Sequence, residues 1–229
     1  MKKVVITQSN YIPWKGFFDA IRTVDEFVVY DDMQYTRRDW RNRNKIKTPQ
    51  GVQWLTIPVE VKGKFFQKIN ETVVSDSNWA EQHWKCIFLN YKKAACFNEM
   101  KEFIEHLYRA VPSNNLSEIN TWFLTQISQW MNLKTKFSSS RQYVLEEERT
   151  ERLVGICRQL GATDYYTGPA AKDYMNEDKF DLAAIRVHYF NYSDYPEYPQ
   201  LYPPFDHFVS IIDLLMHVGK DYSKFMKNG

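Results

Sequence analysis

The first thirty residues contain a strand, a short helix and a second strand, and this unit constrains the fold more than any other part of the chain. Residues 4–7 are β-branched, and residues 26–30 are mostly apolar. Between them lie four apolar residues that share one helical face, namely Trp14, Phe17, Phe18 and Ile21. A strand, a helix of about ten residues and a strand predict a βαβ unit, because two parallel strands need a crossover connection.

The remaining elements are predicted from their apolar patterns. We expect strands over residues 54–59, 68–74, 135–139, 164–167 and 183–190, and helices over residues 78–95, 97–110, 116–132 and 150–160. A last helix is predicted to have Asp206 as its cap, a stripe that includes Phe208 and Ile211, and an end at Gly219. Strands and helices alternate at both ends of the chain. We therefore expect a single α/β domain over residues 1–229, with a Rossmann-like, mostly parallel sheet and a helical insertion at about 77–133.

Composition argues against several function classes. The 229 residues include 30 Lys and Arg against 28 Asp and Glu, so no field over the whole molecule favours nucleic acid or an anionic membrane. The three cysteines, Cys86, Cys96 and Cys157, are an odd number without close pairing, which argues against a disulfide framework and a zinc cluster. No apolar run has the length of a signal-peptide core or a membrane span. We expect a cytoplasmic protein that needs no metal or cofactor.

Polar side chains follow the first two strands where each strand ends. Gln8 ends the first strand, and Asp31 and Asp32 end the second. In an open parallel sheet the ligand crevice lies outside the carboxyl ends of the strands. Neighbouring strand residues point to opposite faces, so we expect at most one aspartate to enter the crevice, as a ligand for a sugar hydroxyl or magnesium or as a general base. The alternative is that both are turn residues.

Six basic residues and one acid, Asp39, lie between residues 37 and 47. The bases are Arg37, Arg38, Arg41, Arg43, Lys45 and Lys47. Arginine binds phosphate with two-point geometry, so this run, expected to be a loop, suits a nucleotide or a diphosphate. Neither the dinucleotide fingerprint G-x-G-x-x-G nor a P-loop is present. Arginines and helix N-termini would therefore have to bind any phosphate, unless the run is only a solvated surface loop.

Three further groups have side chains capable of chemistry. His83 lies at the edge of the apolar stripe of its helix, where one ring nitrogen could reach a cleft. Residues 188–205 form a run rich in tyrosine and proline, which suits a sugar ring or a base but also suits packing on the core. Ser210, Asp213 and His217 lie opposite the apolar stripe of the last helix. No nucleophile elbow accompanies them, so they form a wet face or anchor the helix to neighbouring loops.

With these residues in place, the chain resembles the WbqC-like protein family over nearly its whole length. The matching motifs are residues 8–14, Gly16-Phe17-Phe18, Asp31-Asp32, Gln34, residues 42–47, residues 54–59, Trp79, His83, Tyr91, Arg152-Leu153, Gly161-Ala162, Tyr174, Gln200 and residues 210–215. Two departures are Ser9, where the family usually has proline, and Met216-His217, which replaces a common Phe-Asn pair. The resemblance implies a role in O-antigen and other surface polysaccharide biosynthesis, acting on a nucleotide-linked sugar.

The leading hypothesis is a transferase that acylates or aminoacylates an amino sugar linked to thymidine or uridine diphosphate. His83 or Asp32 would remove a proton from the attacking amine. The expected substrate-binding residues are Gln8, Tyr11, Trp14, Asp31, Arg38, Asn42, Arg43, Asn44, Lys45, Tyr195 and Tyr198. The expected partners are the nucleotide-linked sugar and an acyl or aminoacyl donor. We expect no nucleic-acid partner, and formation of a homodimer is an open alternative.

Two other readings stay open. A nucleotidyltransferase or ligase-like enzyme would also suit an α/β fold with a basic loop, although the H-x-G-H signature of one large nucleotidyltransferase class is missing after the first strand. A non-catalytic binding protein of a glycan assembly complex is the third reading.

Overall fold

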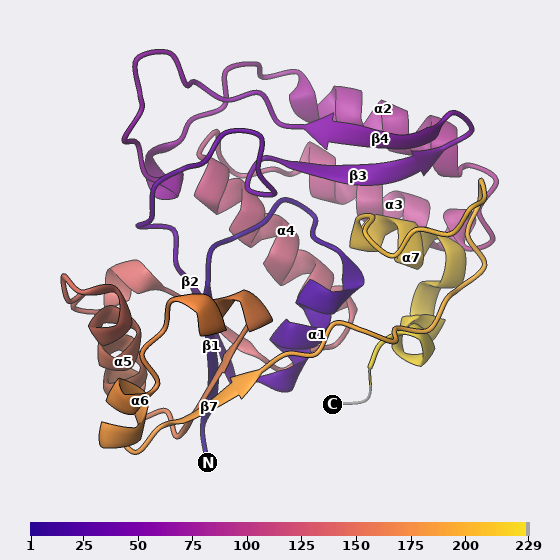
Figure 1. Cartoon of the computed structure of the whole chain (residues 1–229). Helices are drawn as coiled ribbons and strands as arrows, with labels where there is room; N and C mark the ends of the chain where they lie inside the picture. Colours follow the sequence, from indigo (N-terminus) through magenta and orange to yellow (C-terminus); the bar gives the residue numbers. More distant parts are fainter. Residues whose placement is uncertain (228–229) are drawn as a thin grey trace.

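A computed structural model describes residues 1–227 and is organised around a five-stranded, all-parallel sheet. The strands, in spatial order, are β5 (Lys136–Ser139), β2 (Glu26–Val29), β1 (Lys3–Thr7), β6 (Asp164–Thr167) and β7 (Arg186–Tyr189). Counted along the chain, this order is third, second, first, fourth, fifth, which is the Rossmann order. Figure 1 shows the sheet in the lower half of the molecule. The predicted α/β class with a Rossmann-like parallel sheet is confirmed.

The central strand β1 contributes to hydrophobic cores on both faces of the sheet, because successive strand residues point to opposite sides. Val5 packs into the larger core together with Phe27 of β2. Val4 and Ile6 pack into a smaller core on the other face together with Val28. All five side chains are at most 5% exposed, and full burial of such a side chain stabilises a fold by roughly 1.5–3 kcal/mol.

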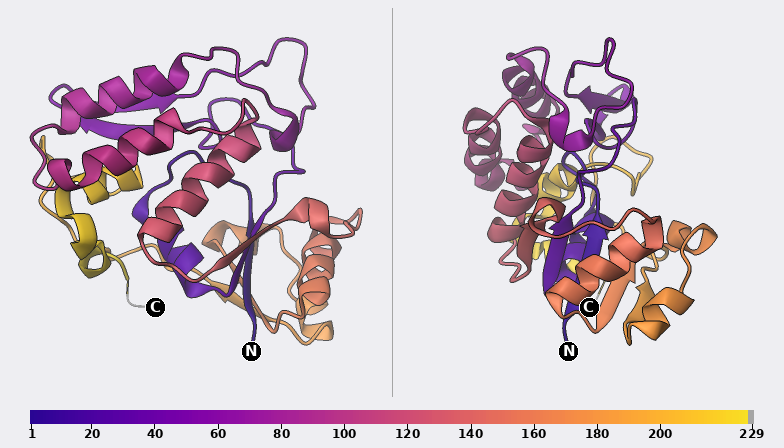
Figure 2. Two further views of the ribbon diagram at one scale, coloured as in Figure 1. Left: turned by 180° about the vertical axis from the view of Figure 1, so that it is seen from behind. Right: turned by 90° about the vertical axis from the view of Figure 1, so that its left-hand side faces the viewer.

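Helices cover both faces of the sheet. The larger core receives α1 (Lys15–Thr23), α2 (Trp79–Tyr91), α3 (Phe97–Arg109), α4 (Leu116–Trp130) and α7 (Ile211–Val218), and the smaller core receives α5 (Arg149–Leu160) and α6 (Asp178–Leu182). Figure 2 shows the two groups on opposite sides of the sheet. In the part of the chain that the structure describes, no helix is long and apolar enough to cross a lipid bilayer.

The segment between β2 and β5 contains more than the predicted helices. An antiparallel hairpin of β3 (Arg43–Thr48) and β4 (Gly51–Thr56) precedes α2. The expectation of a loop over residues 37–47 was therefore wrong for residues 43–47, which belong to β3. Ile46 of this strand lies between polar residues, and its side chain is fully buried. The strand expected over residues 68–74 is a short 3₁₀ turn, Ile69–Glu71, flanked by single bridges.

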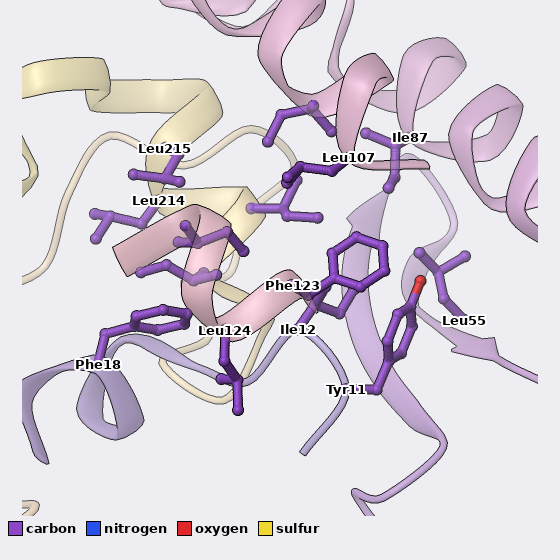
Figure 3. Close-up of a cluster of buried hydrophobic side chains, with 14 of the residues drawn as sticks. Tyr11, Ile12, Phe18, Leu55, Ile87, Leu107, Phe123, Leu124, Leu214 and Leu215 are labelled. Atoms are coloured by element: carbon purple, nitrogen blue, oxygen red, sulfur yellow. The ribbon is translucent and has the colours of Figure 1, made fainter. Parts of the chain in front are cut away.

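The larger core joins the sheet to this segment. Figure 3 shows Tyr11 and Ile12, from the loop after β1, pointing into a cluster with Leu55, Phe123 and Leu215. All of these side chains are at most 3% exposed. The loop that follows the first strand is consequently held by packing on the hairpin, α4 and α7 together.

The C-terminal helix begins later than predicted. Ser210, and not Asp206, caps α7, because the Ser210 hydroxyl accepts a hydrogen bond from the Ile212 N–H at 3.2 Å. Phe208 precedes the helix and is 59% exposed, so it does not belong to the apolar stripe. Three further 3₁₀ helices are η2 (Ser140–Gln142) after β5, η3 (Pro169–Asp173) after β6 and η4 (Gly219–Phe225) after α7.

Candidate functional site

The topological switch point of the sheet lies between β1 and β6. From β1 the chain adds β2 and β5 on one side, and it then returns to add β6 and β7 on the other. Doubly wound sheets bind ligands in the crevice at the carboxyl ends of the strands on either side of such a point. A cavity of about 300 Å³ lies there, lined at its strand ends by Thr7, Gln8 and Thr167. We call it the switch-point pocket.

Two arginines and no carboxylate line the switch-point pocket within the described residues. Gln8 supplies a side-chain amide, Arg41 comes from the turn before the hairpin, and Arg149 comes from the first turn of α5. The remaining lining is Ile6, Thr7, Tyr30, Met33, Leu153, Tyr165, Thr167, Gly168, Ala170, Ala171 and Tyr174. A lining whose charged side chains are all cations favours an anionic ligand such as phosphate.

Arg41 has hydrogen-bonding capacity that the protein leaves unused. Its Nη1 donates to the side-chain oxygen of Asn10 and, at 3.4 Å, to the carbonyl oxygen of Ser9. Its Nε is buried without a hydrogen-bond partner, 3.8 Å from the nearer Asp39 oxygen. Burial lowers the pKa of Arg41, while the charges of Asp39 and Asp31 act in the opposite direction. The guanidinium remains charged at neutral pH, and its Nη2 group, which makes no hydrogen bond among residues 1–227, can donate to an anion in the pocket.

Asp31 positions the loop that carries Gln8. Its carboxylate accepts hydrogen bonds from the Ser9 N–H at 2.8 Å, the Ser9 hydroxyl at 2.6 Å and the Ser117 hydroxyl at 2.5 Å. Burial raises the pKa of Asp31, and these hydrogen bonds only partly counteract the effect. Ser9, which stands where proline is usual in the resembling family, therefore supplies two donors to one buried carboxylate. Asp31 supports the pocket from behind and does not line it.

Arg149 lies at the open side of the same pocket. Its guanidinium carbon is 3.4 Å from the ring centre of Tyr174, and both side chains are exposed. Stacking on an aromatic ring leaves the guanidinium N–H groups free at their edges. The pair can therefore bind an anion without giving up the stacking contact.

A second pocket, of about 360 Å³, is lined mainly by aromatic rings. We call it the aromatic pocket; its lining is Asn10, Pro13, Trp14, Trp40, Asn44, Tyr192 and Phe208. Trp14 contacts Tyr192 and Phe208 with ring centres 5.5 Å apart in each case. The rings come from three distant parts of the chain, and only the packing of residues 190–210 across the loop after β1 brings them together.

The two pockets adjoin. Gln8 and Arg41 line the switch-point pocket. Asn10 and Trp40, which lie close to them in the sequence, line the aromatic pocket. The hydrogen bond from Arg41 to Asn10 joins the two linings.

The wall of the aromatic pocket depends on a glycine. The indole of Trp14 folds back over Gly16, and a Cβ atom on residue 16 would overlap the indole ring. On its other side Trp14 rests on Tyr195, with ring centres 5.3 Å apart. Tyr195 is 7% exposed, so it supports Trp14 from behind, and Tyr192 lines the pocket in its place.

A third cavity, of about 510 Å³, lies beyond the ends of β2 and β5. Its lining includes Asn70, Glu118, Trp122 and Arg141. Asp32 lies beside it, because its Oδ1 accepts a hydrogen bond from the Asn70 amide at 2.9 Å. Its Oδ2 accepts one from the Ser140 hydroxyl. Asp31 and Asp32 lie in the turn after β2, as the alternative in the sequence analysis stated, and their side chains diverge toward different surroundings; neither lines the switch-point pocket.

His83 and Tyr11 lie in the hydrophobic core and line neither adjoining pocket. The Tyr11 hydroxyl is 2.8 Å from His83 Nδ1 and 2.8 Å from the Tyr108 hydroxyl, and His83 Nε2 is 3.2 Å from the Thr56 carbonyl oxygen. A carbonyl only accepts, so Nε2 carries the proton and Nδ1 accepts from Tyr11. Burial lowers the pKa of His83 to about 4. The imidazole is neutral with both nitrogens occupied, which is the arrangement of a structural histidine.

The remaining basic candidates lie on the exposed side of the hairpin. The Arg43 guanidinium is 4.1 Å from a ring centre of Trp54, and Lys45 Nζ is 5.7 Å from that of Trp40. Arg38 is exposed, and its carbonyl oxygen accepts a hydrogen bond from Arg43. None of these three cations lines the switch-point pocket.

The two asparagines of the same run point inward. The Asn42 amide donates to the Ile57 carbonyl oxygen at 2.8 Å, and Asn42 is buried. The Asn44 amide donates to the Tyr11 carbonyl oxygen at 3.0 Å and accepts from the Lys45 N–H at 2.8 Å. Asn44 reaches the aromatic pocket, and Asn42 does not.

Tyr198 belongs to a buried polar cluster on α7. Asp213 is fully buried and accepts hydrogen bonds from the hydroxyls of Tyr91 and Tyr198, both at 2.7 Å, and from the Gln200 amide at 2.8 Å. His217 Nδ1 donates to the Asp213 carbonyl oxygen, and His217 Nε2 accepts from a backbone N–H. The polar face of α7 therefore anchors residues 190–210, as one sequence-based alternative stated.

Sequence reasoning missed the residues that most define the two pockets. These are Arg149 and Tyr174 in the switch-point pocket, and Tyr192 and Phe208 in the aromatic pocket. Arg41 and Trp40 were noticed only as parts of the basic run. The usable signal was the rule that strand-end loops line the crevice, which points to the segment after β6 as well as to that after β1.

Comparison with known proteins places this arrangement in a family. The family model for the WbqC-like protein family matches residues 8–225. The chain belongs to the WbqC-like protein family. This WbqC-like chain is 48% identical over 227 residues to the uncharacterized protein Rv1507c of Mycobacterium tuberculosis (strain ATCC 25618 / H37Rv), covering 99% of the chain and 98% of that protein. No solved structure matches it significantly. The resemblance read from the motifs is confirmed.

Proposed function

We propose that this WbqC-like protein is a cytoplasmic transferase of surface polysaccharide biosynthesis that binds a nucleotide-linked sugar at the switch point. The observation that carries the proposal is a switch-point pocket lined by Arg41, Arg149 and Gln8, without a lining carboxylate. A diphosphate matches this lining, because both guanidinium groups are cations with N–H groups that donate to phosphate oxygens.

The proposed reaction is acylation or aminoacylation of an amino sugar. The amine nitrogen forms a bond to the acyl carbon of an activated ester or thioester, and the bond from that carbon to the leaving group breaks. Asp32 takes the amine proton, since its carboxylate is oriented by Asn70 and Ser140 beside the third cavity. That cavity, at the same edge of the sheet, has room for the acyl donor. His83 has no place in this scheme because both of its ring nitrogens are bonded within the core.

Calorimetry tests the phosphate assignment. Wild-type protein is titrated with uridine and thymidine diphosphate sugars, and so are the variants Arg149→Gln and Arg158→Gln. Arg158 is a matched control, because it is an exposed arginine of the same helix that lines neither pocket. Loss of a charge-assisted hydrogen bond costs roughly 1.5–3 kcal/mol, so Arg149→Gln should weaken binding about tenfold or more. Absence of binding by the wild type at millimolar ligand would overturn the proposal.

A further inference from the structure

We infer that the aromatic pocket is the nucleobase subsite and that it takes a uracil or thymine ring. The inference rests on the proposed function and assigns the part of the ligand that the arginines do not hold. A ring bound here lies close to a diphosphate in the neighbouring pocket, because Trp40 of one lining and Arg41 of the other are consecutive residues and Arg41 donates a hydrogen bond to Asn10.

The lining chemistry selects a flat ring with few polar edges. Aromatic faces are provided by Trp14, Trp40, Tyr192 and Phe208. A base can stack on such faces whatever polar groups lie on its edge. The only side-chain amides are those of Asn10 and Asn44. Asn44 already bonds two backbone groups through its own Nδ2 and Oδ1. A hexose, with hydroxyls around its whole rim, would find few side-chain hydrogen-bond partners in this lining.

Asn10 provides the polar contact that a pyrimidine needs. Its side-chain oxygen must face Arg41, because a guanidinium only donates hydrogen bonds. The Nδ2 group of Asn10 is therefore the end that remains, and it has no hydrogen-bond partner among residues 1–227. It is a donor at the edge of the pocket. Uracil and thymine present two carbonyl oxygens that accept from such a donor.

The pocket also has an adaptable outer wall. Phe208 is 59% exposed and Trp40 is 38% exposed, whereas Trp14 is held between Gly16 and Tyr195. Substitution of the two exposed rings removes stacking surface while leaving the buried core intact. Phe66, which is 88% exposed and lines none of the cavities, is the matched control.

The experiment compares uridine diphosphate, which lacks the hexose, with uridine diphosphate glucose. Both are titrated into wild type, Trp40→Ala, Phe208→Ala, Trp40→Phe, Arg149→Gln and Phe66→Ala. Loss of one stacking partner should weaken binding of both ligands about tenfold in Trp40→Ala and Phe208→Ala. Trp40→Phe should retain most of the affinity, and Phe66→Ala should match the wild type.

Each other outcome has a defined meaning. If uridine diphosphate binds and only Arg149→Gln weakens it, the base assignment is overturned and the phosphate site stands. If Trp40→Ala weakens the nucleotide sugar but not uridine diphosphate, the hexose occupies the pocket and the assignment is again overturned. If neither ligand binds the wild type, the proposed function itself fails.

Discussion

The buried cluster around Asp213 and the switch-point pocket both contain charged side chains on a polar background, but they differ in hydrogen-bond completeness. Asp213 and His217 look catalytic in the sequence, yet the protein supplies partners for both nitrogens of His217 and for both oxygens of Asp213. Arg41 is buried to a lesser degree, and its Nε has no partner. Unused hydrogen-bonding capacity beside a cavity, and not residue type, distinguishes the candidate site from the structural cluster.

The largest effect is expected from Asp213→Ala. The variant leaves the Tyr91 and Tyr198 hydroxyls as buried donors without their acceptor. We expect a loss of about 3–5 kcal/mol in the free energy of unfolding, measured by urea denaturation. Asp213→Asn, which keeps one acceptor oxygen, should lose less. Equal free energies of unfolding for Asp213→Ala and wild type would contradict the structural role assigned to the Asp213 cluster.

A smaller and pH-dependent effect is expected at His83. Its pKa is lowered by burial from 6.5 to about 4 in the folded protein, so the unfolded chain binds a proton more readily. The stability contributed by neutral His83 is complete above pH about 6.5 and is lost as the pH falls toward 4. Between pH 7 and 4.5 the free energy of unfolding of the wild type should fall by about 2–3 kcal/mol more than that of His83→Gln, which has no titrating group at residue 83.

Paired urea titrations of the two proteins at several pH values measure this difference. Parallel curves for wild type and His83→Gln would show that the histidine does not titrate as the core geometry implies. Retained binding of nucleotide sugar by His83→Gln would separate the core histidine from the pocket.

The smallest effect is expected from Gln8→Ala, and it falls on binding alone. The Gln8 side chain makes no hydrogen bond within the described part of the chain and lines the switch-point pocket. Loss of one neutral hydrogen bond to ligand should weaken nucleotide binding about fivefold, while the free energy of unfolding changes by less than about 0.5 kcal/mol. Gln50→Ala, at an exposed turn, is the control. A large loss of stability would place Gln8 with the structural residues.

Local patterns predicted much of the fold. The βαβ unit, the helices α2 to α5 and the strand β6 lie close to their expected bounds, because their apolar periodicity is long or their ends carry strong signals such as Gly161. The hairpin residues 43–48 were expected as loop, because their charges hide the alternation that buries Ile46. The strand expected over residues 68–74 fails because its middle, Ile69–Glu71, winds as a 3₁₀ turn, with the Glu71 and Thr72 N–H groups donating to the Lys68 and Ile69 carbonyl oxygens.

The candidate site was predicted only in part, for a physical reason. Gln8, Trp14 and Asn44, which the sequence singles out, each line a cavity, but only Gln8 is indicated by its position at a strand end. Arg149 and Phe208 lie far along the chain, and no local pattern states what they approach.

The sequence by itself determined the family, the parallel α/β class and the location of polar residues after the first two strands. Only the tertiary structure decided which of these residues have unused hydrogen bonds. It paired His83 with Tyr11, buried Tyr198 against Asp213, and left Arg41 facing a cavity. The reason is that periodicity and turn signals act over a few residues, whereas a hydrogen-bond partner is chosen by contacts between segments that chain folding alone brings together.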